Sequence, residues 1–143
     1  FTNLTFSNFI NIETQLLSIY ILFVCILTDI GSLVFGKIFG GKKLTKISPN
    51  KTISGSIGGI LFSIIIFLVS NDFINMNTVV LFVLTLITSI SSQIGDLFFS
   101  YLKRKAGVKD TGKILPGHGG LLDRIDGILL GFPVGIIFIH LIN

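Results

Sequence analysis

Four long apolar stretches, separated by short polar segments, restrict the possible folds of this chain more than any other feature. They cover approximately residues 16–35, 53–70, 78–99 and 125–142. A helix needs about 20 apolar residues to cross a hydrocarbon core roughly 30 Å thick, and each stretch approaches or reaches this length. Each stretch also contains Gly, Ser or Thr, which favours close helix packing in lipid. We therefore expect an all-α, polytopic transmembrane bundle of about four spans, although the short second stretch could instead be re-entrant.

Composition agrees with this interpretation. Half of the 143 residues are apolar and 13% are charged, and the mean hydropathy is +0.89, which is far from the balance of a soluble domain. No repeat or linker divides the chain, so we expect residues 1–143 to form one membrane-embedded domain. The single cysteine, Cys25, excludes an intrachain disulfide and is interpreted as a packing or lipid-facing residue. Because the chain begins at Phe1, we expect a fragment or a processed product.

The basic residues predict how the chain is oriented. All eleven fall in two connecting regions, which are Lys37, Lys42, Lys43, Lys46 and Lys51 in the first and Lys103, Arg104, Lys105, Lys109, Lys113 and Arg124 in the second. The positive-inside rule therefore predicts two basic cytoplasmic loops, with the loop at 71–77 and both termini outside. The same charges would attract anionic lipid.

Five of the seven acidic residues lie near the ends of spans or in the second basic region, and they are Asp29, Asp96, Asp110, Asp123 and Asp126. Asp29 and Asp96 are embedded in apolar stretches, where ionisable groups are costly and often functional, although a structural ion pair is the alternative. Glu13 and Asp72 lie toward the opposite side, and we interpret them as solvated loop residues.

Asp123 and Asp126 are three residues apart, which places both on one face at the entry of a helix that begins near Ile125. Two neighbouring carboxylates repel unless a cation lies between them, and Mg²⁺ prefers oxygen ligands. Capping of the helix N-terminus explains the same two residues equally well.

A glycine-rich turn, PGHGG at 116–120, precedes this pair. Glycines allow backbone N–H groups to approach an anion, and the surrounding lysines, arginines and aspartates suit a substrate that combines metal and triphosphate. His118 could donate to a phosphate or stabilise the turn. The first basic region offers a smaller cluster with Ser48, Lys51 and Thr52, which lacks the spacing of a Walker A loop and could be an ordinary basic loop.

Residues 100–126 read SYLKRKAGVKDTGKILPGHGGLLDRID, in which S-x-x-K-R, K-D, H-G-G and D-R-x-D follow in this order. This run resembles the signature of the phosphatidate cytidylyltransferases. Asp29, the run GKIFGG at 36–41 and the pattern S-P-x-K-T at 48–52 resemble an earlier part of the same family. The resemblance covers most of the chain from Asp29 onward.

The resemblance implies transfer of a cytidylyl group from CTP to phosphatidate at the cytoplasmic face of a bacterial inner membrane, with Mg²⁺ as cofactor. It implies membrane lipid as a partner, no nucleic acid, and a homodimer as a further option. The implied catalytic residues are Asp110, Asp123, Asp126, Lys109 and His118, and the implied metal ligands are Asp96, Asp110, Asp123 and Asp126. The implied substrate-binding residues are Lys103, Arg104, Arg124, Gly119, Gly120, Ser48, Lys51 and Thr52.

Two departures from the family pattern matter. Many relatives carry Glu where this chain has Ser54, and they commonly have further spans before the part seen here. Two rival functions also remain open. A CTP-dependent polyprenol or phytol kinase would transfer a terminal phosphate to an alcohol, and a transporter would use Asp29 and Asp96 in an ion pathway.

Overall fold

A computed structural model describes residues 12–45, 48, 51–107 and 122–142, and most of this part of the chain is helical. It contains the helices α1 (Ile12–Phe39), α2 (Ile53–Ser70), α3 (Thr78–Lys105) and α4 (Leu122–Ile142). All four are long and apolar enough to cross a membrane. The expected all-α bundle of four spans is therefore confirmed. α2 is one continuous helix of 18 residues, which favours a full span for this stretch over the re-entrant alternative.

Three helices are longer than the apolar stretches that predicted them. At 1.5 Å per residue the 28 residues of α3 reach about 42 Å, more than the hydrocarbon core requires. The last turn of α3 therefore carries Lys103 and Arg104, which we expected in a loop, and the last turn of α1 carries Lys37. Cations near a helix C-terminus interact favourably with its dipole, which explains the longer helices. Glu13 likewise lies in the first turn of α1 and not in a loop.

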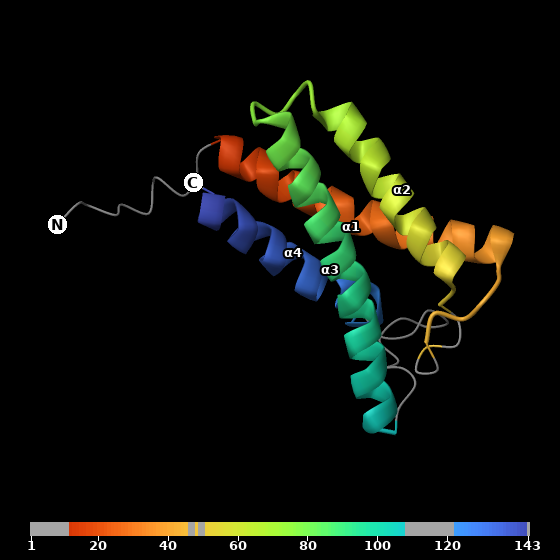
Figure 1. Ribbon diagram of the computed structural model, residues 1–143. Coiled ribbons are helices and arrows are strands. Elements are labelled where there is room, and N and C mark those ends of the chain that lie inside the picture. Colours follow the sequence, from red (N-terminus) through yellow and green to blue (C-terminus); the bar gives the residue numbers. More distant parts are fainter. Residues whose placement is uncertain (1–11, 46–47, 49–50, 108–121, 143) are drawn as a thin grey trace.

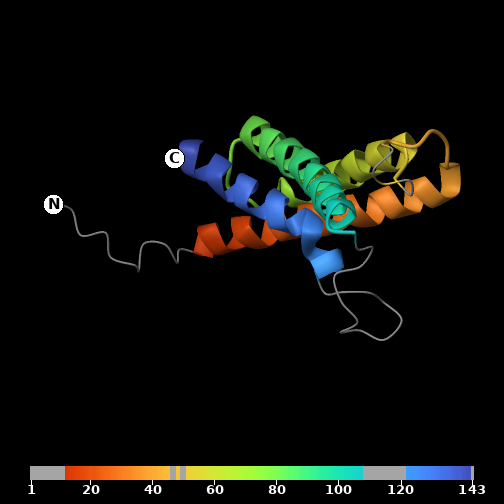
Figure 2. The same ribbon diagram turned by 90° about the horizontal axis from the view of Figure 1, so that it is seen from below.

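The helices form two antiparallel pairs, since α1 packs mainly against α2 and α3 mainly against α4. In Figure 1 the start of α1, the turn between α2 and α3, and the end of α4 lie together at the upper left. The opposite ends of the helices diverge, and in Figure 1 the teal end of α3 points away from the orange end of α1. In Figure 2 the orange end of α1 lies at the right, well beyond the teal end of α3. The basic residues that the structure describes lie at these diverging ends.

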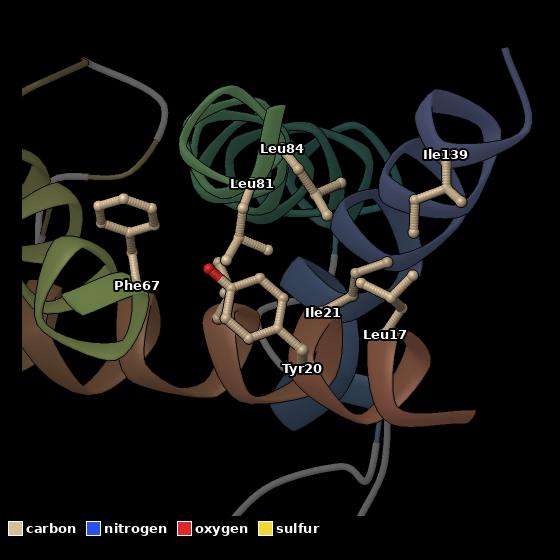
Figure 3. Packing of buried hydrophobic residues seen from close by; sticks show 8 residues of the cluster. Leu17, Tyr20, Ile21, Phe67, Leu81, Leu84 and Ile139 are labelled. Carbon is tan, nitrogen blue, oxygen red and sulfur yellow. The ribbon is translucent and has the colours of Figure 1, made fainter. Parts of the chain in front are cut away.

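The apolar core occupies the end at which the helices converge. It consists of buried side chains from all four helices, which are Leu17, Tyr20, Ile21, Val24, Phe67, Leu81, Leu84 and Ile139. Figure 3 shows most of these side chains directed toward one another between the ribbons. The Tyr20 hydroxyl is hydrogen-bonded to the Thr85 hydroxyl, so that the polar tip of this residue is satisfied inside the core.

Small residues bring the helices close together between this core and the diverging ends. Gly127, Gly131 and Gly135 recur every four residues and lie on one face of α4. A Cβ atom at Gly131 would lie 2.7 Å from Cys25 Sγ and 3.0 Å from Ser92 Cβ, so α4 contacts both α1 and α3 here. The structure therefore agrees with the glycine-mediated packing that the sequence predicts.

Candidate active site

A cavity of about 700 Å³ lies at the diverging end of the bundle, between α1, the start of α2, the second half of α3 and the start of α4. Its wall combines polar and apolar residues. The polar residues that line it include Asp29, Lys51, Thr52, Gln93, Asp96, Ser100 and Asp126. The apolar residues include Ile26, Ile30, Leu33 and Ile128. The cavity therefore suits a ligand with both a charged and an apolar part.

Lys51 and Asp96 form an ion pair across this cavity. Lys51 Nζ donates to Asp96 Oδ2 at 2.5 Å, and the two side chains are 30% and 19% exposed. The sequence left a structural ion pair open for Asp96, and the structure shows such a pair. Its partner, however, is a lysine that the family resemblance assigns to the substrate. The pair therefore lies inside the candidate site and joins α3 to the segment that precedes α2.

Asp126 lies beside Asp96 and has a lysine of its own. The two carboxyl groups are within hydrogen-bonding reach of each other, and Asp126 Oδ2 is 3.5 Å from Lys103 Nζ. A Cβ atom at Gly95 would lie 3.0 Å from the Asp126 carbonyl oxygen, so this glycine allows α4 to approach α3 closely. The Lys103 and Asp126 side chains are 16% and 13% exposed.

The structure also tests the capping interpretation of Asp126. Because α4 begins at Leu122, Asp126 lies in the second turn of the helix and not at its N-cap. Its Oδ1 atom accepts a hydrogen bond of 3.0 Å from the next backbone group, Gly127 N–H, whereas an N-cap side chain accepts from the second or third residue beyond it. The capping alternative is therefore wrong for Asp126.

Asp29 adds a third carboxyl group from a third helix. A Cβ atom at Gly127 would lie 3.0 Å from Asp96 Oδ1 and 3.2 Å from Asp29 Oδ1, which shows that α1 and α3 direct both carboxyl groups toward the start of α4. The sequence predicts a functional role for Asp29 but does not say which groups it meets. The signal for this role was that Asp29 is the one charged residue within a long apolar stretch of the sequence.

The segment before α2 has a defined local structure that fixes the backbone of Lys51. Lys51 N–H donates to the Ser48 carbonyl at 3.1 Å, and the Lys51 carbonyl accepts from Leu44 N–H at 2.7 Å. Thr52 is the N-cap of α2, and its hydroxyl oxygen accepts from Gly55 N–H at 3.1 Å. Thr52 therefore has a structural task at the cavity wall in addition to the substrate contact that the resemblance implies.

The remaining predicted site residues either do not line the cavity or lie outside the described part of the chain. Arg104 is exposed in the last turn of α3 and Ser48 is half-buried, and neither lines the cavity. Asp123 and Arg124 lie in the first turn of α4, and their side chains are outside the described part. The predicted residues Lys109, Asp110, His118, Gly119 and Gly120 also lie outside the described residues.

Sequence reasoning missed several polar residues that line the cavity, and Gln93 and Ser100 are the two that flank Asp96 on α3. Gln93 lies one helical turn before Asp96, and its Nε2 atom donates to the Ser56 carbonyl at 3.2 Å, which joins α3 to α2. Ser100 lies one turn after Asp96 on the same side of α3. The signal for both was the spacing of three to four residues around a carboxylate in an apolar stretch.

The carboxylates fit a mode of Mg²⁺ binding in which the substrate supplies some of the ligands. Among the described residues, no group of three or more His, Cys, Asp or Glu side chains could hold a metal ion by itself. Mg²⁺ is usually bound by one or two carboxylates, with substrate phosphates and water completing its octahedron. Asp96 and Asp126 are neighbours, and each lies beside a lysine. They are compatible with this mode of binding, in which two carboxylates, substrate phosphates and water surround the ion.

Comparison with known proteins gives a consistent result. The sequence model of the cytidylyltransferase family matches residues 4–142. The chain is similar to proteins named phosphatidate cytidylyltransferase from three staphylococcal species. The protein of Staphylococcus haemolyticus is 48% identical over 119 residues, which are 81% of this chain. Those of Staphylococcus epidermidis and Staphylococcus aureus are each 49% identical, over 80% and 81% of this chain. The chain covers 46% of the length of each of these relatives.

Proposed function

Because the chain belongs to the cytidylyltransferase family, we propose that it transfers a cytidylyl group from CTP to phosphatidate and releases pyrophosphate. An ionised phosphate oxygen of phosphatidate attacks the α-phosphorus of CTP, and the bond between the α- and β-phosphates breaks. A phosphate monoester is largely ionised near neutral pH, so the attacking group needs no general base. Catalysis then depends mainly on positioning and on stabilisation of negative charge.

One observation carries this proposal, namely the cavity in which two lysines and three carboxyl groups meet an apolar wall. Lys37 and Lys51 line the cavity, and Lys103 reaches its carboxyl groups through the ion pair with Asp126. Ile26 and Ile30 of α1 line the apolar part. A lipid phosphate fits this combination, because its headgroup needs cations while its acyl chains need apolar surroundings.

The residues divide the work according to their charge. Lys51 and Lys103 neutralise phosphate oxygens, assisted by Arg104, Lys109, Arg124 and His118. Ser48, Thr52, Gly119 and Gly120 bind substrate through hydroxyl and backbone groups. Asp96 and Asp126 hold Mg²⁺ together with Asp110 and Asp123. When bound there, Mg²⁺ stabilises negative charge on the transferring group and on the departing pyrophosphate.

The proposal includes a place in the cell. The four spans and the bacterial relatives favour an integral membrane protein, and we infer that it lies in the inner membrane with the cavity at the cytoplasmic face, where CTP is available. Phosphatidate then reaches the cavity from the bilayer. Association of two copies is part of the same proposal, and crosslinking in intact membranes tests it.

The position of a radioactive label in CTP tests the reaction. The purified chain in mixed micelles receives phosphatidate, Mg²⁺ and CTP labelled at the α- or the γ-phosphate. Cytidylyl transfer puts the α-label into the lipid and the γ-label into pyrophosphate. A parallel reaction receives a polyprenol or phytol in place of phosphatidate. Transfer of the γ-label to this alcohol, without transfer of the α-label to phosphatidate, would overturn the proposal in favour of a CTP-dependent lipid kinase.

A matched pair of variants shows whether the activity belongs to this cavity. Asp126→Asn removes a carboxylate from the site, whereas Asp72→Asn removes one from the exposed turn at the opposite end of the bundle. Loss of labelled lipid with the first variant and normal labelling with the second supports the assignment. Ion flux in liposomes without any CTP turnover would favour the transporter instead.

A further inference from the structure

Ser54 lies in the first turn of α2, and the structure gives its side chain a specific task. We propose that Ser54 is a positioning residue, which holds the segment before α2 so that Lys51 points toward Asp96. The inference rests on the proposed function, because it concerns the lysine that would bind substrate phosphate. It assigns no chemical step to Ser54 itself.

Ser54 connects the end of α1 with the start of α2. Gly40 caps α1 in the left-handed conformation, with φ +56°, and its N–H donates to the Gly36 carbonyl at 3.1 Å. The Gly40 carbonyl accepts a hydrogen bond from the Ser54 hydroxyl. Ser54 Oγ is also 3.0 Å from the hydroxyl oxygen of Thr52, the N-cap of α2. One side chain thus joins the C-cap of one helix to the N-cap of the next.

Backbone hydrogen bonds continue this connection toward Lys51. Ile53 N–H donates to the Lys42 carbonyl at 3.1 Å, and Lys43 and Thr52 form an antiparallel bridge. Leu44 N–H then donates to the Lys51 carbonyl at 2.7 Å. The two sides of the segment, residues 42–44 and 51–53, are thereby held together from the helix ends up to Lys51. Ser54 closes the end of this short ladder that lies against the helices.

The task requires a hydrogen-bond donor. A carbonyl oxygen can only accept, and a serine hydroxyl can donate to it, whereas an ionised glutamate cannot. A Glu at position 54 would instead place a negative charge against the Gly40 carbonyl. The anchor that the structure shows therefore depends on the hydroxyl group of Ser54.

The consequence for Lys51 follows from its geometry. Its side chain has four rotatable bonds, and pairing with Asp96 fixes all of them, which costs conformational entropy. Anchoring the Lys51 backbone lowers the remaining cost, because the side chain then starts from a fixed point. If the ladder loosens at Ser54, the ammonium group should spend less time at Asp96 and more time in water.

The test compares the reactivity of the Lys51 amine in the full chain, in detergent and without substrate, with the kinetics of CTP use. In Ser54→Ala we expect several-fold faster modification of Lys51 by an amine-specific reagent, measured by mass spectrometry of the peptides. We also expect a raised KM for CTP with a smaller change in kcat. Ser54→Thr keeps the hydroxyl and should restore both values, whereas Ser54→Glu should behave like Ser54→Ala.

Ser18→Ala is the matched control, because the Ser18 hydroxyl also donates to a backbone carbonyl, that of Thr14 at 2.8 Å, but at the far end of α1. It should leave Lys51 reactivity unchanged. Unaltered Lys51 reactivity in Ser54→Ala would overturn the inference, and so would a Ser54→Glu variant that matches or exceeds the parent. If Lys51 reactivity changes as expected but the parent transfers no cytidylyl group, the proposed function fails while the positioning role stands.

Discussion

At the scale of single residues, charges alternate across the candidate site. Lys51 pairs with Asp96, Asp96 lies beside Asp126, and Asp126 lies near Lys103. A partly buried carboxylate without a cation is costly, so each lysine compensates the carboxylate beside it. The same lysines are the proposed phosphate ligands. When metal and nucleotide bind, we therefore expect the two lysines to move from the carboxylates to phosphate oxygens and the two carboxylates to bind the metal.

This exchange predicts effects of opposite sign for Lys51→Met. The KM for CTP should rise by about tenfold or more, because a charge-assisted hydrogen bond contributes about 1.5–3 kcal/mol. Binding of Mn²⁺ without nucleotide, followed by electron paramagnetic resonance, should become tighter, because no lysine then competes for Asp96. Lys43→Met removes an exposed lysine that does not line the cavity and should change neither value. Weaker binding of Mn²⁺ in Lys51→Met would contradict the exchange.

Asp123 and Asp126 remain the first choice for the catalytic cation, and replacement of either by Asn tests this. Metal stabilisation of a transferring phosphoryl group is worth several kcal/mol, so turnover should fall by ~100-fold or more in each variant. The amount of protein in membranes should change little, because Asn keeps the size of the side chain. Near-normal turnover of both variants at unchanged Mg²⁺ dependence would reject the metal assignment.

At the scale of elements, the contact of α4 with α1 and α3 depends on glycine. Gly127, Gly131 and Gly135 leave room for Ser92 and Thr88 of α3 and for Cys25 and Ile21 of α1. In lipid there is little hydrophobic driving force between helices, so close van der Waals contact is a main source of their association. The same contacts bring Asp126 to Asp96. Packing and site geometry are therefore coupled through one helix face.

Adding bulk at Gly131 should separate these helices. Even the first added carbon would lie 2.7 Å from Cys25 Sγ, so we expect Gly131→Leu to destabilise the fold by about 1–3 kcal/mol. Thermal unfolding in detergent measures the change. Ile137→Phe adds volume to the same helix at a position that is 56% exposed and serves as the control. A similar melting temperature for both variants would argue against glycine-mediated packing.

At the scale of the whole molecule, the described basic residues lie at one end and the apolar core toward the other. The antiparallel order of the helices brings Lys51 and Lys103 to the same end of the bundle, although they are far apart in the sequence. This agrees with the expectation that both basic regions lie on one side of the membrane. It also explains how two separate regions can contribute to a single site.

The predicted orientation can be measured with single cysteines at Lys43 and Asn75, which are exposed at opposite ends. Background from Cys25 should be low because its side chain is fully buried. In sealed inverted vesicles, an impermeant maleimide should label Lys43→Cys and leave Asn75→Cys unlabelled until detergent is added. Equal labelling of both positions from one side would rule out the four-span topology.

The sequence by itself determined the class of fold, the number of spans and the residues that could take part in the chemistry of the site. Hydropathy acts locally, because every stretch of about 20 apolar residues must satisfy its own backbone hydrogen bonds in lipid, and a helix does so. This is why α2 could be predicted with its observed ends, Ile53 and Ser70. The stretches for α1, α3 and α4 were predicted too short, because hydropathy does not detect helical turns that extend into water.

Only the tertiary structure decided which of these residues meet. No local pattern predicts that Asp29, Asp96 and Asp126 converge from three helices, or that each of the last two has a particular lysine beside it. Convergence depends on where helices cross, and the crossing depends on contacts between distant glycines and small side chains such as Gly95, Gly127 and Ser92. Likewise, Ser54 is an unremarkable serine in the sequence. Its partner is the Gly40 carbonyl, and only the return of the chain from α1 to α2 brings the two together.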